Sequence, residues 1–153
     1  MLRLPDVLRA ELEAWIRAGY PHETCGLLIG RPIRSAASAA VPEGGPLPAD
    51  DTAAEVVRVV QARNLNVERA HDRFELDPED FMRADEEARA AELEIVGIWH
   101  SHPDHPAQPS ETDRAAAWEG WSYVIASVTA SAVTAVRSFR LQGEAFAEES
   151  VVS

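Results

Sequence analysis

The sequence has very little cysteine: Cys25 is the only one in 153 residues. A disulfide within the chain is therefore excluded, and so is a zinc site built from four cysteines. Long apolar runs are also missing. No stretch approaches the length of a membrane span, and Asp6, Arg9 and Glu11 interrupt the apolar residues of the N-terminus, so a secretory signal is not expected there. We expect a cytoplasmic protein.

Basic residues are scarce beside acidic ones, with 14 Lys and Arg against 26 Asp and Glu and a formal net charge of −12. Such a surface repels the phosphates of nucleic acids and the head groups of anionic lipids. We therefore expect no nucleic-acid partner and no membrane partner, and a basic or neutral protein face is easier to accommodate. The composition is otherwise ordinary for a globular protein, and the length suits one domain over residues 1–153.

Hydrophobic periodicity predicts two longer helices. Apolar residues from Leu4 to Ile16, Val7 among them, recur at helical spacing and predict a first helix that ends near Gly19. Asp77 followed by proline is typical of a helix N-cap. The inner face of this second helix is expected to hold the following residues: Phe81, Ala84, Ala88 and Ala91.

The remaining segments predict strands and one more helix. The apolar run 24–30 is expected to be a buried strand closed by Gly30 and Pro32, and 31–54 is expected to be loop, with one weak strand over 35–41. A third helix is expected over 110–120. Further strands are expected in these ranges: 55–63, 73–76, 94–99, 121–128, 132–141 and 144–152. The order predicts a single-domain α/β sandwich in which helices flank one mixed sheet.

The segment IWHSHPDHPAQPSETD, residues 98–113, contains residue types that bind metals. His100 and His102 stand two residues apart at the end of a predicted strand, so both side chains project to one face. Asp113, in the first turn of the helix that begins at Ser110, could supply a carboxylate oxygen. Two histidines and one carboxylate leave the fourth tetrahedral position open to water, which is the arrangement of a catalytic zinc site.

Each piece alone has an ordinary explanation. A His-x-His pair by itself is weak support for a metal site, and Ser110-x-x-Asp113 by itself is a helix capping box. The His22-Glu23 pair does not begin a zincin motif, because position 26 is glycine and not histidine.

Taken together, the pieces resemble the signature of the JAMM (MPN+) zinc metallopeptidases. The pattern is His100-x-His102, seven residues, Ser110, two residues and Asp113, and Glu23 stands upstream before an apolar strand, where that family keeps its catalytic acid. The resemblance is to the small stand-alone prokaryotic members. It implies an α/β fold with a layout similar to that of the cytidine deaminases.

The resemblance also implies roles for these five residues. His100, His102 and Asp113 would bind one zinc ion per chain. Glu23 would be the general acid/base that moves a proton from the attacking water to the leaving amine, and Ser110 would stabilise the tetrahedral oxyanion. The substrate implied is a peptide or isopeptide bond at the C-terminal Gly-Gly tail of a ubiquitin-like or sulfur-carrier protein.

Three alternatives compete with this function. A zinc nucleobase deaminase requires a Pro-Cys-x-x-Cys pair, which a chain with one cysteine excludes. A non-catalytic scaffold of the same family and a zinc hydrolase of small peptides or amides both remain open. Oligomeric state is not indicated by the sequence.

Other titratable residues are weaker candidates. His105 is expected in a loop beside the site, His22 in an exposed turn and His71 in a solvated charged stretch. Cys25 is expected to be a buried thiol with a high pKa and not a nucleophile.

Overall fold

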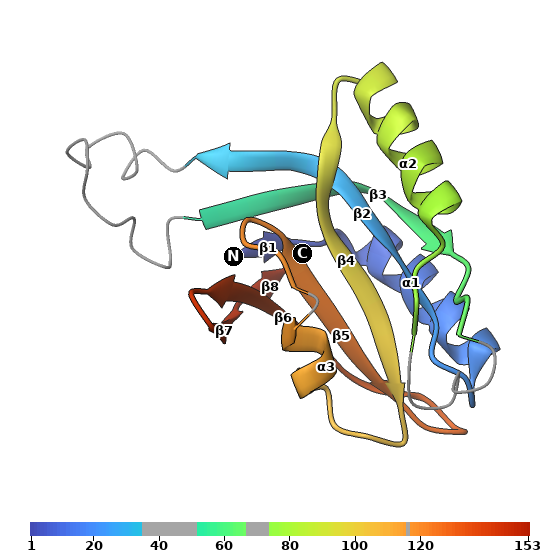
Figure 1. Cartoon of the computed structure of the whole chain (residues 1–153). Helices are drawn as coiled ribbons and strands as arrows, with labels where there is room; N and C mark the ends of the chain where they lie inside the picture. Colours follow the sequence, from blue (N-terminus) through green and yellow to red (C-terminus); the bar gives the residue numbers. More distant parts are fainter. Residues whose placement is uncertain (35–51, 67–73, 116) are drawn as a thin grey trace.

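A single eight-stranded mixed sheet forms the centre of the molecule (Figure 1). The computed structural model describes residues 1–34, 52–66, 74–115 and 117–153. The strand order is β7-β6-β5-β4-β2-β3-β1-β8, and the β4–β5, β1–β3 and β1–β8 pairs are parallel while the other pairs are antiparallel. The prediction of a mixed α/β fold is therefore confirmed.

Helices interrupt the succession of strands along the chain. The strands are β1 (Leu2–Arg3), β2 (Cys25–Arg34), β3 (Thr52–Ala62), β4 (Glu94–Pro103), β5 (Ser122–Val128), β6 (Val133–Gln142), β7 (Ala145–Glu149) and β8 (Val151–Val152). The helices are α1 (Asp6–Gly19), α2 (Pro78–Ala90) and α3 (Glu111–Ala115).

Side chains that alternate along β2 enter two separate cores. Leu28 belongs to the core that also contains Leu12 and Ile16 of α1. Leu27 belongs to the core that also contains Ala84 and Ala88 of α2. Because successive side chains of a strand point to opposite faces, α1 and α2 pack on different faces of the sheet.

The two longer helices start and end close to where the sequence predicts. Asp77 caps α2, since its carboxylate accepts a hydrogen bond of 2.9 Å from the backbone N–H of Glu79. Two details differ. Val7 is 79% exposed and does not belong to the buried face of α1, and Ala91 is exposed because it follows the last residue of α2.

The strand β2 is longer than expected and runs through Pro32 to Arg34. It pairs with β4 only over Cys25–Gly30, but with β3 over Cys25–Arg34. Proline is tolerated in a strand whose N–H side needs no partner, and within the described residues β2 is bordered by β3 alone beyond Gly30. The expectation of loop over 31–54 is therefore wrong at both ends, and the weak strand expected over 35–41 lies outside the described residues.

Three further expectations need correction. The helix α3 is five residues long and does not reach 120, since residues 117–120 are not helical; none of its residues is buried, so nothing in the core holds a longer helix. In the expected strand at 73–76 only an isolated bridge, Asn64 to Leu76, is found among the described residues. The last strand is divided into β7 and β8, and β1 was not expected at all.

None of the helices in the described part of the chain is long and apolar enough to span a bilayer.

Candidate functional site

The two histidines lie on β4, the strand that β2 and β5 border on either side. His100 is in register with Cys25 of β2 and with Ile125 of β5, and His102 is in register with Ser127 of β5. The sheet therefore holds His100 from both edges of β4, because pairing with β2 extends to this residue, and holds His102 from the β5 edge. His100 is 1% exposed, while the side chain of His102 is 12% exposed.

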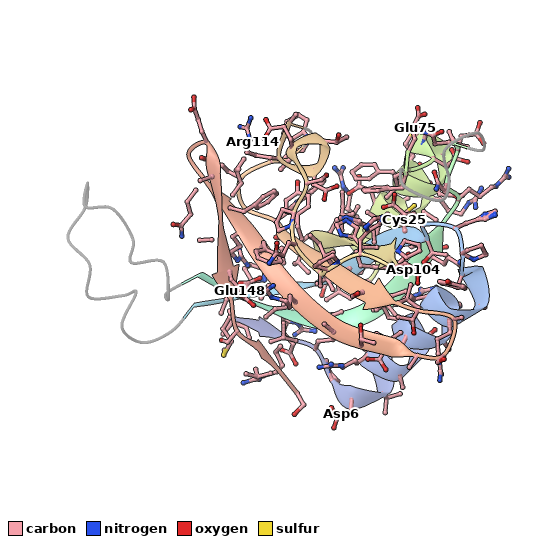
Figure 2. The ribbon with its side chains drawn as sticks, turned by 90° about the horizontal axis from the view of Figure 1, so that it is seen from below. Asp6, Cys25, Glu75, Asp104, Arg114 and Glu148 are labelled. Atoms are coloured by element: carbon pink, nitrogen blue, oxygen red, sulfur yellow. The ribbon has the colours of Figure 1, made fainter. Side chains whose placement is uncertain are left out.

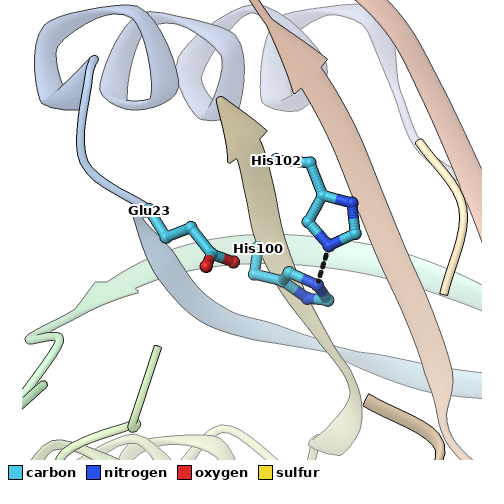
Figure 3. A group of neighbouring side chains, drawn as sticks. All are labelled: Glu23, His100 and His102. Atoms are coloured by element: carbon cyan, nitrogen blue, oxygen red, sulfur yellow. Dashed lines mark hydrogen bonds between the residues drawn. The ribbon is translucent and has the colours of Figure 1, made fainter. Parts of the chain in front are cut away.

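The nitrogen and oxygen atoms expected to bind metal converge. The Nε2 atoms of His100 and His102 are 3.1 Å apart (Figure 3). Oδ1 of Asp113 lies 3.4 Å from Nε2 of His100, and Oδ2 lies 3.4 Å from Nε2 of His102. Two ligand atoms at about 2.0–2.1 Å from one tetrahedral zinc ion would be roughly 3.3–3.4 Å apart, so these three residues fit such an ion.

Hydrogen bonding at the ring of His102 also suits metal binding. Its Nδ1 lies 3.0 Å from the carbonyl oxygen of Pro106. A carbonyl only accepts, so Nδ1 carries a proton, and in the neutral ring Nε2 keeps the lone pair that a metal-binding histidine requires. The ring of His100 stacks on Phe74 with centroids 4.4 Å apart, and its Nδ1 is buried without a hydrogen-bond partner among the described residues.

Glu23 joins the two histidines from the segment that precedes β2 (Figure 3). Each of the three residues offers one ligand atom, and these atoms lie within 4.8 Å of one another, so the group could hold a metal ion. The side chain is buried, with 5% of its residue surface exposed. A carboxylate here is close enough to exchange a proton with a water molecule bound between it and the histidines.

Backbone hydrogen bonds hold the segment that carries Glu23. The Asn64 side chain donates to the carbonyl of Glu23 at 3.1 Å. The N–H of Thr24 donates to the Ser101 hydroxyl at 2.9 Å, and the N–H of Ser101 donates to the carbonyl of Thr24 at 3.0 Å. Ser101 stands between the two histidines, so the same residue connects β4 to the segment of Glu23.

The surroundings favour the neutral ring of His100 and the charged carboxylate of Asp113. Burial lowers the pKa of His100, against the opposing effect of Asp113. Burial by itself raises the pKa of Asp113, but hydrogen bonds from His100 and His102 outweigh it and hold this pKa well below its ordinary value. Burial also lowers the pKa of His102, but hydrogen bonds to Asp113 and Pro106 outweigh it and raise the pKa.

Ser110 and Asp113 form the reciprocal bonds of a capping box. The N–H of Ser110 donates to Oδ2 of Asp113 at 2.8 Å, and the N–H of Asp113 donates to the Ser110 hydroxyl at 3.0 Å. The capping interaction that the sequence indicates is therefore present. It also orients Asp113, because the bond from Ser110 holds the carboxylate that faces the histidines.

The expected site residues all border one cleft of about 640 Å³. Glu23, His100 and His102 come from the sheet side of it, while Ser110 and Asp113 come from α3 and the turn before it. Apolar residues line much of the remainder: Phe74, Leu76, Ile98, Pro103, Pro106, Pro109 and Tyr123.

The weaker candidates lie where the sequence predicts. His22 is exposed, and His105 is an exposed residue at the border of the cleft. Cys25 is fully buried, and burial together with the charge of Glu23 raises its pKa to about 12; Figure 2 shows it inside the molecule, with Asp6, Arg114 and Glu148 at the periphery. His71 lies outside the described residues.

Sequence reasoning missed three residues that shape the site. Asn64 and Ser101 fix the segment of Glu23, and Phe74 covers the ring of His100. Asn64 and Glu23 are 41 positions apart, and Thr24 and Ser101 are 77 apart. No local pattern indicates such contacts. The one sequence feature that could have suggested Ser101 is its place between two histidines.

Fold and site together define an α/β protein with a histidine and carboxylate cluster in an open cleft, the class to which small metal-dependent hydrolases belong. The family of prokaryotic homologues of the JAB domain matches residues 5–142, and the chain belongs to this family. The resemblance to JAMM (MPN+) proteins is thereby confirmed.

Individual relatives agree with this family. A desampylase of Haloferax volcanii is 35% identical over 108 residues, which are 70% of this chain and 63% of that protein. A desampylase of Pyrococcus furiosus is 52% identical over 40 residues, 26% of this chain and 29% of that one. The chain therefore spans less than two thirds of these relatives. A solution structure from Desulfitobacterium hafniense is similar with a TM-score of 0.77 and 28% identity, over 99% of this chain and 92% of that one.

Proposed function

We propose that the chain is a zinc-dependent peptidase or isopeptidase that acts on the C-terminal Gly-Gly tail of a ubiquitin-like or sulfur-carrier protein. His100, His102 and Asp113 would hold one zinc ion per chain. The observation that carries the proposal is the convergence of two Nε2 atoms 3.1 Å apart with the carboxylate of Asp113 at 3.4 Å from each, with Glu23 beside them.

Zinc held there would supply Lewis acidity for attack of water on a carbonyl carbon. Glu23 is the base of the reaction: it takes a proton from the attacking water and returns it to the leaving amine. Its burial between the histidines and the cleft keeps the carboxylate within reach of both positions. A second basic group is not needed for this transfer.

Ser110 is the proposed oxyanion donor. Its hydroxyl accepts from the N–H of Asp113, so the hydroxyl proton is directed elsewhere, and Ser110 borders the cleft. A donor aimed at the developing charge of a tetrahedral intermediate stabilises it more than it stabilises the substrate. Cap and donor therefore use different atoms of one side chain.

The substrate class rests on the family and on the shape of the cleft. Two relatives carry the name desampylase, which together with the JAMM resemblance supports a ubiquitin-like substrate. The cleft is apolar over Phe74, Leu76 and Ile98, and an extended tail that ends in two glycines could lie against this lining with its backbone close to the site.

The proposal is tested with purified protein and small ubiquitin-like carriers from the same organism, each extended past Gly-Gly by one residue. Intact mass should show cleavage directly after Gly-Gly. A chelator should stop the reaction and added zinc should restore it. A carrier with the two glycines replaced by leucine is the matched control and should stay intact. If only short peptides are hydrolysed and no carrier is cleaved, the zinc mechanism is retained and the proposal of a ubiquitin-like substrate is overturned.

A further inference from the structure

A second recess meets the proposed active site at Glu23. It has a volume of about 440 Å³, and Glu23 lines both this recess and the larger cleft. The second recess is lined by polar and charged side chains, Arg63 and Arg83 among them. The base of the proposed reaction therefore stands on the boundary between an apolar cleft and a polar recess.

Within the described residues, each of the two arginines has an exposed side chain that makes one long ion pair with a largely buried carboxylate. Arg63 is 3.9 Å from Asp77 with its side chain 77% exposed, and Arg83 is 3.4 Å from Asp80 with its side chain 67% exposed. Contacts of this length hold an exposed arginine side chain weakly, so both guanidinium groups can turn toward a better acceptor.

One carboxylate in the recess already has hydrogen-bond donors. Asp80 accepts the backbone N–H of Arg63 at 2.8 Å, in addition to its pair with Arg83. In a chain of net charge −12, this recess sets two arginines against two carboxylates, Glu23 and Asp80. A planar guanidinium is the group that binds a carboxylate best, because it can donate two parallel hydrogen bonds.

We propose that Arg63 and Arg83 bind the α-carboxylate of the leaving group, so that the preferred substrate carries a free amino acid or dipeptide after its Gly-Gly tail. This inference rests on the proposed function. The acyl side of the scissile bond would occupy the apolar cleft. The amine side would extend past Glu23 into the recess, and one or two residues reach about 3.3–3.6 Å each.

The reaction balances with water as the only co-reactant. The water oxygen forms a bond to the last glycine's carbonyl carbon, and the bond from this carbon to the leaving nitrogen breaks. One proton of the water passes through Glu23 to that nitrogen, and the second leaves the new carboxylic acid group for the solvent or the released amine. The products are a carrier that ends in a Gly-Gly carboxylate and an amino acid or dipeptide whose carboxylate faces the two arginines.

Three substrates with one carrier test the specificity. The first ends in Gly-Gly-Ala with a free carboxylate, the second is its C-terminal amide, and the third carries an isopeptide bond to the side chain of a lysine within a longer peptide. We expect the free acid to be cleaved about tenfold more efficiently, as kcat/KM, than the amide or the isopeptide, neither of which places a carboxylate at that distance. Equal rates for acid and amide would overturn the inference.

Variants identify the residues responsible. Arg63→Gln combined with Arg83→Gln should remove the preference by slowing the acid while leaving the amide unchanged. Arg89→Gln is the matched control, since Arg89 lies on the same helix as Arg83 and is 78% exposed in an ion pair with Asp85. It should keep the full preference. A double variant that slows acid and amide equally would also overturn the inference.

A binding measurement separates this inference from the proposed function. Alanyl-alanine, or its C-terminal amide, is titrated into isotope-labelled protein while the Nε–H signals of the arginines are followed by NMR. The acid should shift the signals of Arg63 and Arg83 and leave Arg89 unmoved. If the arginine signals shift but no carrier is cleaved, the carboxylate site is supported and the proposed function is overturned. If carriers are cleaved but the signals do not shift, only the carboxylate site is overturned.

Discussion

The two halves of the site differ in what holds them. Glu23, His100 and His102 come from the central sheet and the segment that leads into it. The strand β4 is paired along both edges as far as His100, and Glu23 and His100 are 5% and 1% exposed. Ser110 and Asp113 come from the start of α3, a five-residue helix with no buried side chain. The sheet half is held by the core of the protein, and the helix half by the capping box and by the contacts of Asp113.

This difference indicates which half depends on metal. The sheet places its imidazoles correctly before any ion binds, because register and packing determine them. A short exposed helix has little stability of its own, so Asp113 gains its position from Ser110 and from the atoms it faces. Loss of the metal ion should therefore disturb the position of Asp113 more than the positions of the two histidines.

The largest effect is expected from the ligands. His100→Ala and Asp113→Ala should each lose tightly bound zinc and bring turnover to background, because two protein ligands hold zinc much less tightly than three. Elemental analysis of dialysed protein measures this. His105→Ala, at the border of the same cleft, should keep its zinc. Full zinc in both ligand variants would contradict the assignment.

Glu23→Gln should reduce turnover by about 10²–10⁴-fold while zinc stays bound, since the amide cannot carry the proton but no ligand is removed. Steady-state rates and metal content measured on one preparation give the answer. Glu75→Gln makes the same change at an exposed position of the same cleft and should have little effect. A Glu23→Gln protein with normal turnover would mean that another residue is the base.

The residues that the sequence singled out lie together in the structure, and most of them are also close together in the chain. The spacing from His100 to Asp113 follows from one strand end and one helix start, and side-chain alternation places both histidines on one face. The long helices were predicted for the same local reason: Asp77 marks one start, and apolar periodicity marks α1. Only Glu23 lies far away, and the family resemblance supplied it.

What could not be predicted depends on distant contacts. The strand β1 has two residues, too few for any periodicity, and forms because β3 and β8 pair with it. Pro32 stays in β2 because β3 pairs with that end of the strand. The length of α3 was overestimated because alanine favours helix locally, whereas no contact with the core stabilises a longer helix.

Ser110→Ala should lower turnover by about 10²-fold if the hydroxyl stabilises the oxyanion, and should lose about 1 kcal/mol of stability as a missing cap. Ser110→Asp separates the two roles, because aspartate caps a helix but does not donate. This variant should regain the stability and stay slow. If its turnover recovers with its stability, Ser110 is a cap and no more.

Ser101→Ala tests the sheet half with a smaller effect. Ser101 is fully buried, and removing its hydroxyl leaves the N–H of the half-buried Thr24 without its acceptor, which should cost about 1–3 kcal/mol in the free energy of unfolding. Turnover should fall moderately with zinc retained, because the segment that carries Glu23 loses one hydrogen bond to β4. Ser138→Ala is the control: it is equally buried but bonds to Glu149, so it should destabilise the fold at unchanged turnover.

The smallest effect is expected at Cys25, which lies in register with His100 but does no chemistry in the proposed reaction. Its side chain is fully buried, and its pKa is raised to about 12 by burial first and by the charge of Glu23 second. The reactive thiolate therefore becomes appreciable only as pH rises toward that value.

Cys25→Ser should leave turnover unchanged, and iodoacetamide at neutral pH should modify the folded protein slowly without inhibiting it. Mass spectrometry of native and denatured samples, alongside rate measurements, checks both points. Rapid alkylation of the folded protein with parallel loss of activity would identify a thiol nucleophile and contradict a water-based mechanism, because only a residue that attacks the substrate itself must be a thiolate in the working range of pH.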